Sequence, residues 1–261
     1  MKKIFVINSR GKREEFSFQK VFDSAKRAGA QEKLAGWVAN EIARKARNGI
    51  KTYDIFREVK RLLKKDSPDV ALRFSLKDAM RKLGPTGFTF EKYIGRVFEA
   101  LGYEVKLNQI VKGKCISYEI DFLAKKGDVF LLGECKYRNM LKDRVHTKDI
   151  LITYARFLDI QEVFPAKLKP ILVTNTKFTQ RTASFAKCRG IGLLGWREPF
   201  NNGLEQIIDQ YKLFPITILP SLNKHLAEVL SAQNKVLAKD VLSQTDKRFE
   251  KLKQEAQTLF L

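Results

Sequence analysis

A carboxylate and an ammonium group lie two residues apart at the end of the chain's most apolar candidate strand. In GDVFLLGECKYRN, residues 127–139, a turn precedes the apolar run that ends at Leu132, and Glu134 and Lys136 follow. Successive side chains of a strand point to opposite faces, so Glu134 and Lys136 share one face and Cys135 points to the other. The pair is either a solvated strand end or the centre of a site.

A second acidic residue lies on the preceding candidate strand, ISYEIDF, where Asp121 falls toward the strand end. If KKGD, residues 125–128, forms a four-residue turn, Ala124 pairs with Val129. Counting back along that register sets Asp121 opposite Leu132 and diagonal to Glu134 on the same face. We therefore expect the two carboxylates to lie close together.

Two neighbouring carboxylates repel each other unless a cation lies between them, and Mg²⁺ prefers oxygen ligands. Asp121 and Glu134 thus outline a metal site, with Mn²⁺ as the alternative ion. Lys136 could orient an attacking water or stabilise charge that develops on a phosphate. An upstream helix adds Glu91 at the edge of its apolar face. The spacing alone is weak, because Glu104 and Lys106 repeat it on a strand that no acidic strand precedes.

The pattern of apolar residues predicts two different halves. Residues 3–84 read as two strands followed by four helices, with Thr52 as the N-cap of the third helix. A break at residues 84–87 leads into a segment with the order αβββαβαβ, which implies a mixed sheet covered by helices. From about Ser221 the chain reads as charged helices, either a dimer arm or a DNA-gripping module.

Residues 86–197 resemble the PD-(D/E)XK nuclease superfamily, and most closely its Mrr-like restriction endonuclease branch. The segments that carry the resemblance are FTFEKYIGRVFEALGYEV, EIDFLA and LLGECKY. It implies Mg²⁺-dependent cleavage of DNA, in which Asp121 and Glu134 bind the metal, the Cys135 carbonyl is a further ligand and Glu91 an outer one. Lys136 completes the implied catalytic set. The family often approaches the aspartate through glycines, where this chain has ISYEID, so substrate handling is expected to differ more than metal binding.

Residues 3–84 resemble an ATP-cone, the nucleotide-binding regulatory module of ribonucleotide reductases and a related repressor. VINSRGKREEFSFQKV, NGIKTYDIF and DVALRF carry this resemblance. It implies ATP or dATP as a regulatory ligand, held by Glu14, Lys20 and Thr52. The family usually has two basic residues where this chain has Asn8 and Ser9, which removes phosphate-binding charge. A cone remodelled for packing or for DNA binding is the alternative.

The charge balance points to a polyanionic partner. The 261 residues carry 50 Lys and Arg against 29 Asp and Glu, a net charge of +21, and residues 1–84 account for about +12 of it. Phosphate contacts dominate nucleic-acid affinity, so DNA is the expected partner. The apolar runs are too short to span a bilayer and no secretory signal is recognisable, so we expect a cytoplasmic protein. Three cysteines without a CxxC pattern indicate neither a disulfide framework nor a zinc site.

Together these patterns predict an α/β chain, α+β overall, with three parts. They are an ATP-cone-like domain over residues 1–84, a nuclease domain over 85–200 and a mainly helical extension over 201–261. The expected function is that of a metal-dependent deoxyribonuclease under adenine-nucleotide control, with a homodimer as one arrangement. The alternative is a non-catalytic, nucleotide-sensing regulator that uses a nuclease-like fold only to hold DNA.

Overall fold

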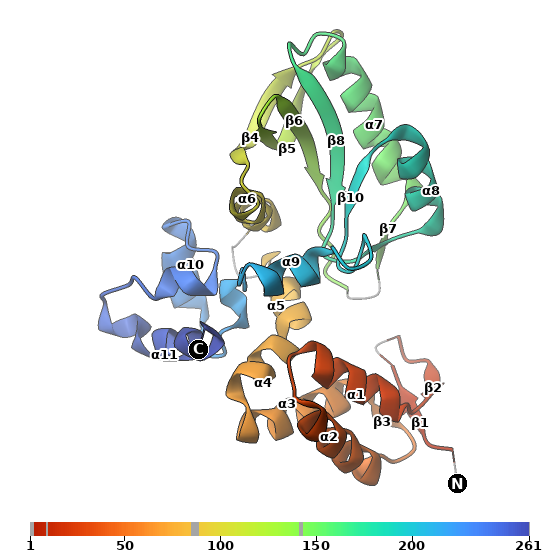
Figure 1. Cartoon of the computed structure of the whole chain (residues 1–261), viewed down its shortest axis with the longest axis vertical. Coiled ribbons are helices and arrows are strands. Elements are labelled where there is room, and N and C mark those ends of the chain that lie inside the picture. Colours follow the sequence, from red (N-terminus) through yellow and green to blue (C-terminus); the bar gives the residue numbers. More distant parts are fainter. Residues whose placement is uncertain (1–2, 9, 85–88, 141–142, 261) are drawn as a thin grey trace. The chain divides into compact units, whose positions relative to one another are not determined.

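The computed structural model describes residues 3–8, 10–84, 89–140 and 143–260. The chain divides into two compact units, one formed by residues 1–78 and 253–261 and the other by residues 79–252. Figure 1 shows the elements of both units. The predicted boundary at residues 84–87 lies largely outside the described residues. The two compact units divide within helix α5 (Leu76–Lys82).

The first unit combines a small sheet with helices. Strands β1 (Phe5–Ile7) and β2 (Arg13–Glu15) form an antiparallel hairpin, and β3 (Ile50–Lys51) pairs with β1 in parallel. The helices are α1 (Phe18–Arg27), α2 (Glu32–Lys45), α3 (Thr52–Asp66) and α4 (Pro68–Phe74), and the C-terminal helix α11 (Glu250–Phe260) lies mostly in this unit. The inward faces of α1 to α4 bury one apolar cluster that includes Val38, Leu62 and Leu63.

Two sequence predictions for this unit are wrong. Thr52 is the first residue of α3, and the preceding Lys51 belongs to β3, so Thr52 is not the N-cap. The fourth predicted helix is divided into α4 and α5 at Ser75, whose hydroxyl donates a hydrogen bond to the Ala71 carbonyl at 3.1 Å. Such back-bonding lets a serine compete with the regular helical pattern.

The second unit is built on a five-stranded sheet in the order β10-β8-β6-β5-β4. Its strands are β4 (Glu104–Lys112), β5 (Ser117–Lys126), β6 (Val129–Cys135), β8 (Lys167–Val173) and β10 (Gly192–Leu194). β4, β5 and β6 pair antiparallel, whereas β6, β8 and β10 pair in parallel. The predicted αβββαβαβ order and mixed sheet are therefore confirmed.

Helices cover both faces of this sheet (Figure 1). On one side, Phe98 of α6 (Phe90–Ala100) packs against Phe122 of β5 with ring centroids 4.9 Å apart. On the other, Phe157 of α7 (Thr147–Gln161) packs into an apolar cluster with Leu132 of β6, and α8 (Gln180–Arg189) lies beside α7. A two-stranded parallel pair, β7 (Arg144–Val145) with β9 (Lys177–Phe178), was not predicted from the sequence.

The hairpin between β5 and β6 differs from the predicted register. Ala124 pairs with Leu131 and Phe122 with Gly133, so the strands run on to a two-residue turn at Gly127 and Asp128. Gly127 has a φ of +57°, which suits the first central position of a type II′ turn. The observed register differs from the predicted one by two residues. Because strand side chains alternate between faces with a period of two, every side chain still lies on its predicted face.

The C-terminal part is helical, as predicted. It contains α9 (Leu204–Gln210), α10 (Lys224–Ala232) and α11, with short 3₁₀ turns at Ile216–Ile218, Ala238–Val241 and Lys247–Phe249. Up to residue 252 it belongs to the second unit: the Tyr93 hydroxyl of α6 donates to the Leu213 carbonyl at 2.7 Å, and Arg96 pairs with Asp240 at 3.2 Å. Among the described residues, no helix has the length and apolar character needed to cross a membrane.

Candidate active site

Asp121 and Glu134 meet where the β5–β6 pairing ends. The last paired residues are Phe122 and Gly133, and the next step of that register sets Asp121 opposite Glu134 rather than opposite Leu132. The backbone N–H of Cys135 donates a hydrogen bond of 2.6 Å to Asp121 Oδ2. The structure therefore brings the two carboxylates closer in register than the sequence prediction did.

Glu134 is buried, with 7% of its surface exposed, and two cations hold it. Lys136 Nζ donates to Oε1, and Arg156 Nη1 lies 3.2 Å from Oε2. Arg156 is on α7 and was missed by sequence reasoning, since one arginine at the edge of a helical face carries no distinguishing pattern. A buried carboxylate flanked by two partly exposed cations is suited to a role near phosphate, because both cations can still reach solvent.

The pKa of Asp121 is raised to about 6. Burial is the main cause; the charges of Glu134 and Glu91 raise it further, while the Cys135 N–H and Lys136 oppose the rise. Glu91, in the first turn of α6, is thus part of the same electrostatic environment. Mutual repulsion of this kind is relieved when a cation is bound.

The chemistry of this donor set fits Mg²⁺ or Mn²⁺, which take carboxylate oxygens as ligands. Within the described ranges, however, no group of three or more His, Cys, Asp and Glu side chains is arranged to hold a metal. Both Glu134 oxygens are directed to protein cations, Lys136 and Arg156. The Cys135 thiol is buried and burial raises its pKa, so it is not suited to act as a nucleophile.

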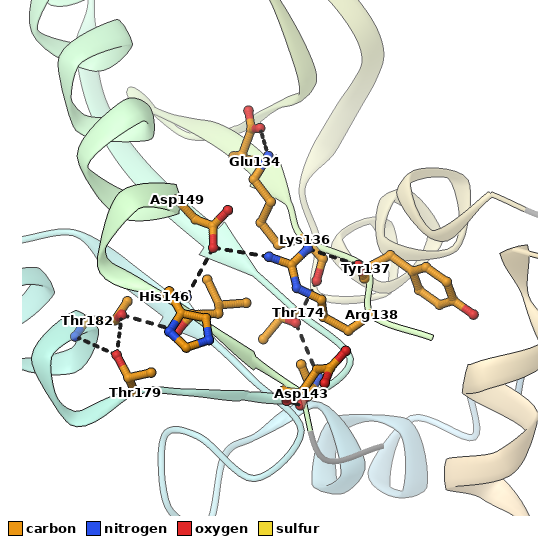
Figure 2. A network of polar contacts seen from close by, with 12 residues as sticks. Glu134, Lys136, Tyr137, Arg138, Asp143, His146, Asp149, Thr174, Thr179 and Thr182 are labelled. Carbon is orange, nitrogen blue, oxygen red and sulfur yellow. Dashed lines mark hydrogen bonds and ion pairs between the residues drawn. The ribbon is translucent and has the colours of Figure 1, made fainter. Parts of the chain in front are cut away.

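A network of polar contacts holds the chain directly after β6 (Figure 2), and its members Thr174, Asn175 and Asp149 are buried. The Thr174 hydroxyl donates to the Lys136 carbonyl at 2.6 Å. Asn175 accepts from the Arg138 N–H and donates to the Arg138 carbonyl, both at 2.9 Å. Arg138 Nη2 lies 3.1 Å from Asp149 Oδ2 on α7. The backbone of residues 136–138 is thereby held by the segment that follows β8 and by α7.

The predicted nucleotide residues gather in the first unit. Glu14 of β2, Lys20 of α1 and Thr52 of α3 line one cavity of about 220 Å³, whose walls also include Phe56. Asn8 accepts backbone N–H bonds from residues 10 and 12 at 2.9 and 3.2 Å and so shapes the hairpin turn. Ser9 lies outside the described residues.

Comparison with known proteins identifies a relative in sequence. An uncharacterized protein of Archaeoglobus fulgidus is 35% identical over 161 residues, which are 61% of this chain and 89% of that protein. The crystal structure of AF1548, a protein of unknown function, superposes with a TM-score of 0.55 at 32% identity, covering 65% of this chain and 92% of that one. No protein-family model matches the chain.

Two restriction endonuclease structures show a weaker likeness. MspJI in complex with a 27-mer oligonucleotide gives a TM-score of 0.35 at 12% identity, covering 63% of this chain and 35% of MspJI. The DNA modification-dependent restriction endonuclease AspBHI gives 0.33 at 13% identity, with coverage of 61% and 38%. Scores at this level do not establish a shared reaction. The Archaeoglobus fulgidus protein, by contrast, is 35% identical and is covered over 89% of its length. The chain therefore belongs to the same protein family as that uncharacterized protein.

Proposed function

We propose that the second unit is a metal-dependent DNA endonuclease that hydrolyses phosphodiester bonds. The observation that carries the proposal is the close set of Asp121, Glu134 and Lys136 at the end of β6, together with the raised pKa of Asp121. Perturbed carboxyl groups that share an environment are typical of functional sites. A solvated strand end would leave Glu134 exposed, whereas it is buried.

The roles follow from the positions of the side chains. Asp121 and Glu134 would hold the ion, with Glu91 and the Cys135 carbonyl as further candidate ligands. A bound Mg²⁺ would polarise the phosphate and make a nearby water more acidic. The Lys136 ammonium and the Arg156 guanidinium can donate hydrogen bonds to phosphate oxygens where negative charge increases during hydrolysis. Lys136 or Arg156 can contact phosphate only when its ion pair with Glu134 weakens. Binding of the metal ion by Glu134 would favour that change.

The net charge supports DNA as the substrate. A chain with a surplus of 21 basic side chains is attracted to a phosphate backbone at a distance, and its affinity should fall steeply with salt. The rival function is a DNA-binding regulator without catalysis. It predicts the same salt dependence but no product, so only a cleavage assay separates the two.

The test is cleavage of supercoiled plasmid, linear and branched DNA by the purified full chain in Mg²⁺, Mn²⁺ or EDTA. We expect cleavage with either ion and none in EDTA. Glu134→Gln should reduce the rate at least ~100-fold, and Lys136→Ala similarly, while DNA affinity changes little because other phosphate contacts provide it.

The matched control is Glu104→Gln on β4, where a glutamate also lies two residues before a lysine but pairs across the strands with Lys125. That variant should cut like the wild type. If Glu134→Gln also cuts at the wild-type rate, the assignment of the site is wrong.

A second function, binding of an adenine nucleotide, is favoured by the cavity that Glu14, Lys20 and Thr52 line. We propose that ATP or dATP binds there weakly, because the chain has Asn8 and Ser9 where two basic residues would contact phosphate. Calorimetry at millimolar nucleotide should detect heat that Lys20→Ala abolishes. A nucleotide can regulate cleavage only if it binds two states of the chain with different affinities. If the site is regulatory, ATP or dATP should therefore also change the cleavage rate.

A further inference from the structure

The outward face of α7 is apolar. Leu151, Ile152 and Leu158 are 46%, 53% and 39% exposed, and Ala155 between them is exposed as well. We call these four residues the α7 stripe. Single exposed apolar side chains are ordinary on protein surfaces, but a row of them on one helix is characteristic of an interaction surface.

The α7 stripe is separate from the core of its own unit. Leu151, Ala155 and Leu158 follow each other at intervals of four and three, which places them on one helical face. The opposite face, with Ile150, Phe157 and Ile160, is the buried one. The helix is therefore apolar on two sides, although packing against the sheet requires only one.

Ile116 extends the exposed apolar surface beyond the helix. It is 60% exposed and lies in the connection between β4 and β5. The backbone N–H groups of Cys115 and Ile116 donate to the Asp159 carboxylate of α7 at 2.9 and 3.4 Å, which fixes this connection beside the helix. The exposed apolar surface is thus formed by α7 and by the connection between β4 and β5, and these hydrogen bonds fix the two relative to each other.

The ends of the α7 stripe carry opposite charges at equal distances from its centre. Lys148 and Glu162 each lie seven residues from Ala155, and both are exposed. If two copies of α7 pack antiparallel about an axis at Ala155, Lys148 of one copy lies opposite Glu162 of the other, and Ile152 lies opposite Leu158. The small side chain at the centre permits close approach, and the helix dipoles then oppose each other favourably.

The existing partner of Glu162 does not conflict with this arrangement. Lys114 Nζ lies 2.6 Å from Glu162, but the two side chains are 62% and 52% exposed. Exposed ion pairs of this kind contribute little to stability, so sharing Glu162 with a second copy has a small cost.

We propose that the α7 stripe is a two-fold interface at which a second copy of this chain docks. On the proposed nuclease function, on which this part of the inference rests, the dimer would present two sites and so cut both strands of a duplex. One helix pair and its flanks form an interface near the small end of the range, so dimerisation should depend on protein concentration.

Cysteine cross-linking tests the geometry directly. In a full-length Cys115→Ser/Cys188→Ser background, which removes the two exposed thiols, Ala155→Cys places a thiol at the proposed axis. Mild oxidation should convert most of it to a disulfide-linked dimer, because the paired Cα atoms would lie within disulfide range. Ala183→Cys, an equally small exposed position on α8, should remain monomeric under the same conditions.

Sedimentation equilibrium supplies a second measurement without cross-linking. The wild type should approach twice its 30.1 kDa mass as concentration rises, and Leu158→Glu should shift this equilibrium at least 10-fold toward monomer. Absence of an Ala155→Cys dimer, equal cross-linking at Ala183→Cys, or an unchanged equilibrium in Leu158→Glu would each overturn the proposal.

The outcome is separable from that of the nuclease proposal, since neither measurement uses DNA or metal. If both proposals hold, Leu158→Glu should nick supercoiled plasmid but produce at least 10-fold less linear DNA than the wild type. If the chain dimerises through α7 but cuts nothing, the interface stands and the nuclease function fails.

Discussion

Replacing Asp121 with asparagine should stabilise the metal-free protein while it removes a candidate metal ligand. Asparagine keeps an oxygen that can accept the Cys135 N–H, so the 2.6 Å hydrogen bond can persist in weaker form. What disappears is a carboxylate whose pKa is raised from 3.8 to about 6, chiefly by burial. A site that holds unfavourable charge for function is expected to lower stability.

The sign follows from proton binding. Because the pKa is higher in the folded state, the folded protein binds the proton more tightly, and stability falls as the pH rises from about 4 to about 6. The penalty is fully present above about pH 7, one unit above the folded-state pKa. A rise of this size corresponds to at most ~3 kcal/mol, and partial solvent exposure of the side chain reduces our expectation to ~1–2 kcal/mol.

The assay is urea unfolding in EDTA, followed by fluorescence of Trp196, which is 1% exposed and lies in the second unit. The chain has two tryptophans, so Trp37→Phe in all variants isolates the signal. At pH 7.5 Asp121→Asn should raise the free energy of unfolding by ~1–2 kcal/mol, and the gain should shrink toward pH 4.

Asp159→Asn is the control, because it should change the free energy of unfolding in the opposite direction. Its carboxylate accepts hydrogen bonds from Cys115 and Ile116, which hold its pKa below the usual range, so that variant should be less stable at pH 7.5. The reasoning on Asp121 is refuted if Asp121→Asn is no more stable than the wild type at pH 7.5, or if its gain is the same at both pH values.

Three further predictions concern packing, the loop after β6 and the first unit. Gly133→Ala would place a Cβ 2.1 Å from the buried Phe122 ring, so we expect a loss of ~2 kcal/mol or more in urea unfolding, partly restored by Phe122→Leu. Asn175→Ala removes both 2.9 Å bonds to Arg138 and should cost ~2 kcal/mol in the same assay, whereas an unchanged midpoint would mean that water replaces the amide. Ion pairing lowers the pKa of Glu58 to about 2, chiefly through Arg61, so its stabilisation is complete above pH ~4.5 and disappears as the pH falls toward 2. Glu58→Gln should therefore be less stable than the wild type by ~0.5–1 kcal/mol at pH 7, by circular dichroism, and the two should converge at low pH.

The periodicity of apolar residues was enough to predict the sheet and its helices. Strand alternation in ISYEIDF and VFLLGEC placed Asp121 and Glu134 on one face, and that inference survived a register error, because the observed hairpin is shifted by two residues. Helical spacing predicted α6 and α7 in the same way. These features are encoded locally, since burial of one face imposes a period on the chain.

The turn between β5 and β6 could not be predicted from the local sequence. KKGD is compatible with a four-residue turn, and the choice of a two-residue turn at Gly127 depends on how far the two strands continue to pair. Thr52 shows the same limit: a threonine before a helical pattern suggests an N-cap, but pairing of β3 with β1 moved the cap to Lys51. Both outcomes depend on a neighbouring strand rather than on the segment alone.

Only the tertiary structure decided which groups surround the carboxylates. Arg156 reaches Glu134 because α7 packs on that face of the sheet, and Asn175 holds Arg138 because β8 lies beside β6. These contacts join residues 22 and 37 positions apart, at distances that no periodicity specifies. The sequence by itself determined which residues share a face, whereas burial, charge coupling and the raised pKa of Asp121 arise only when separate elements meet.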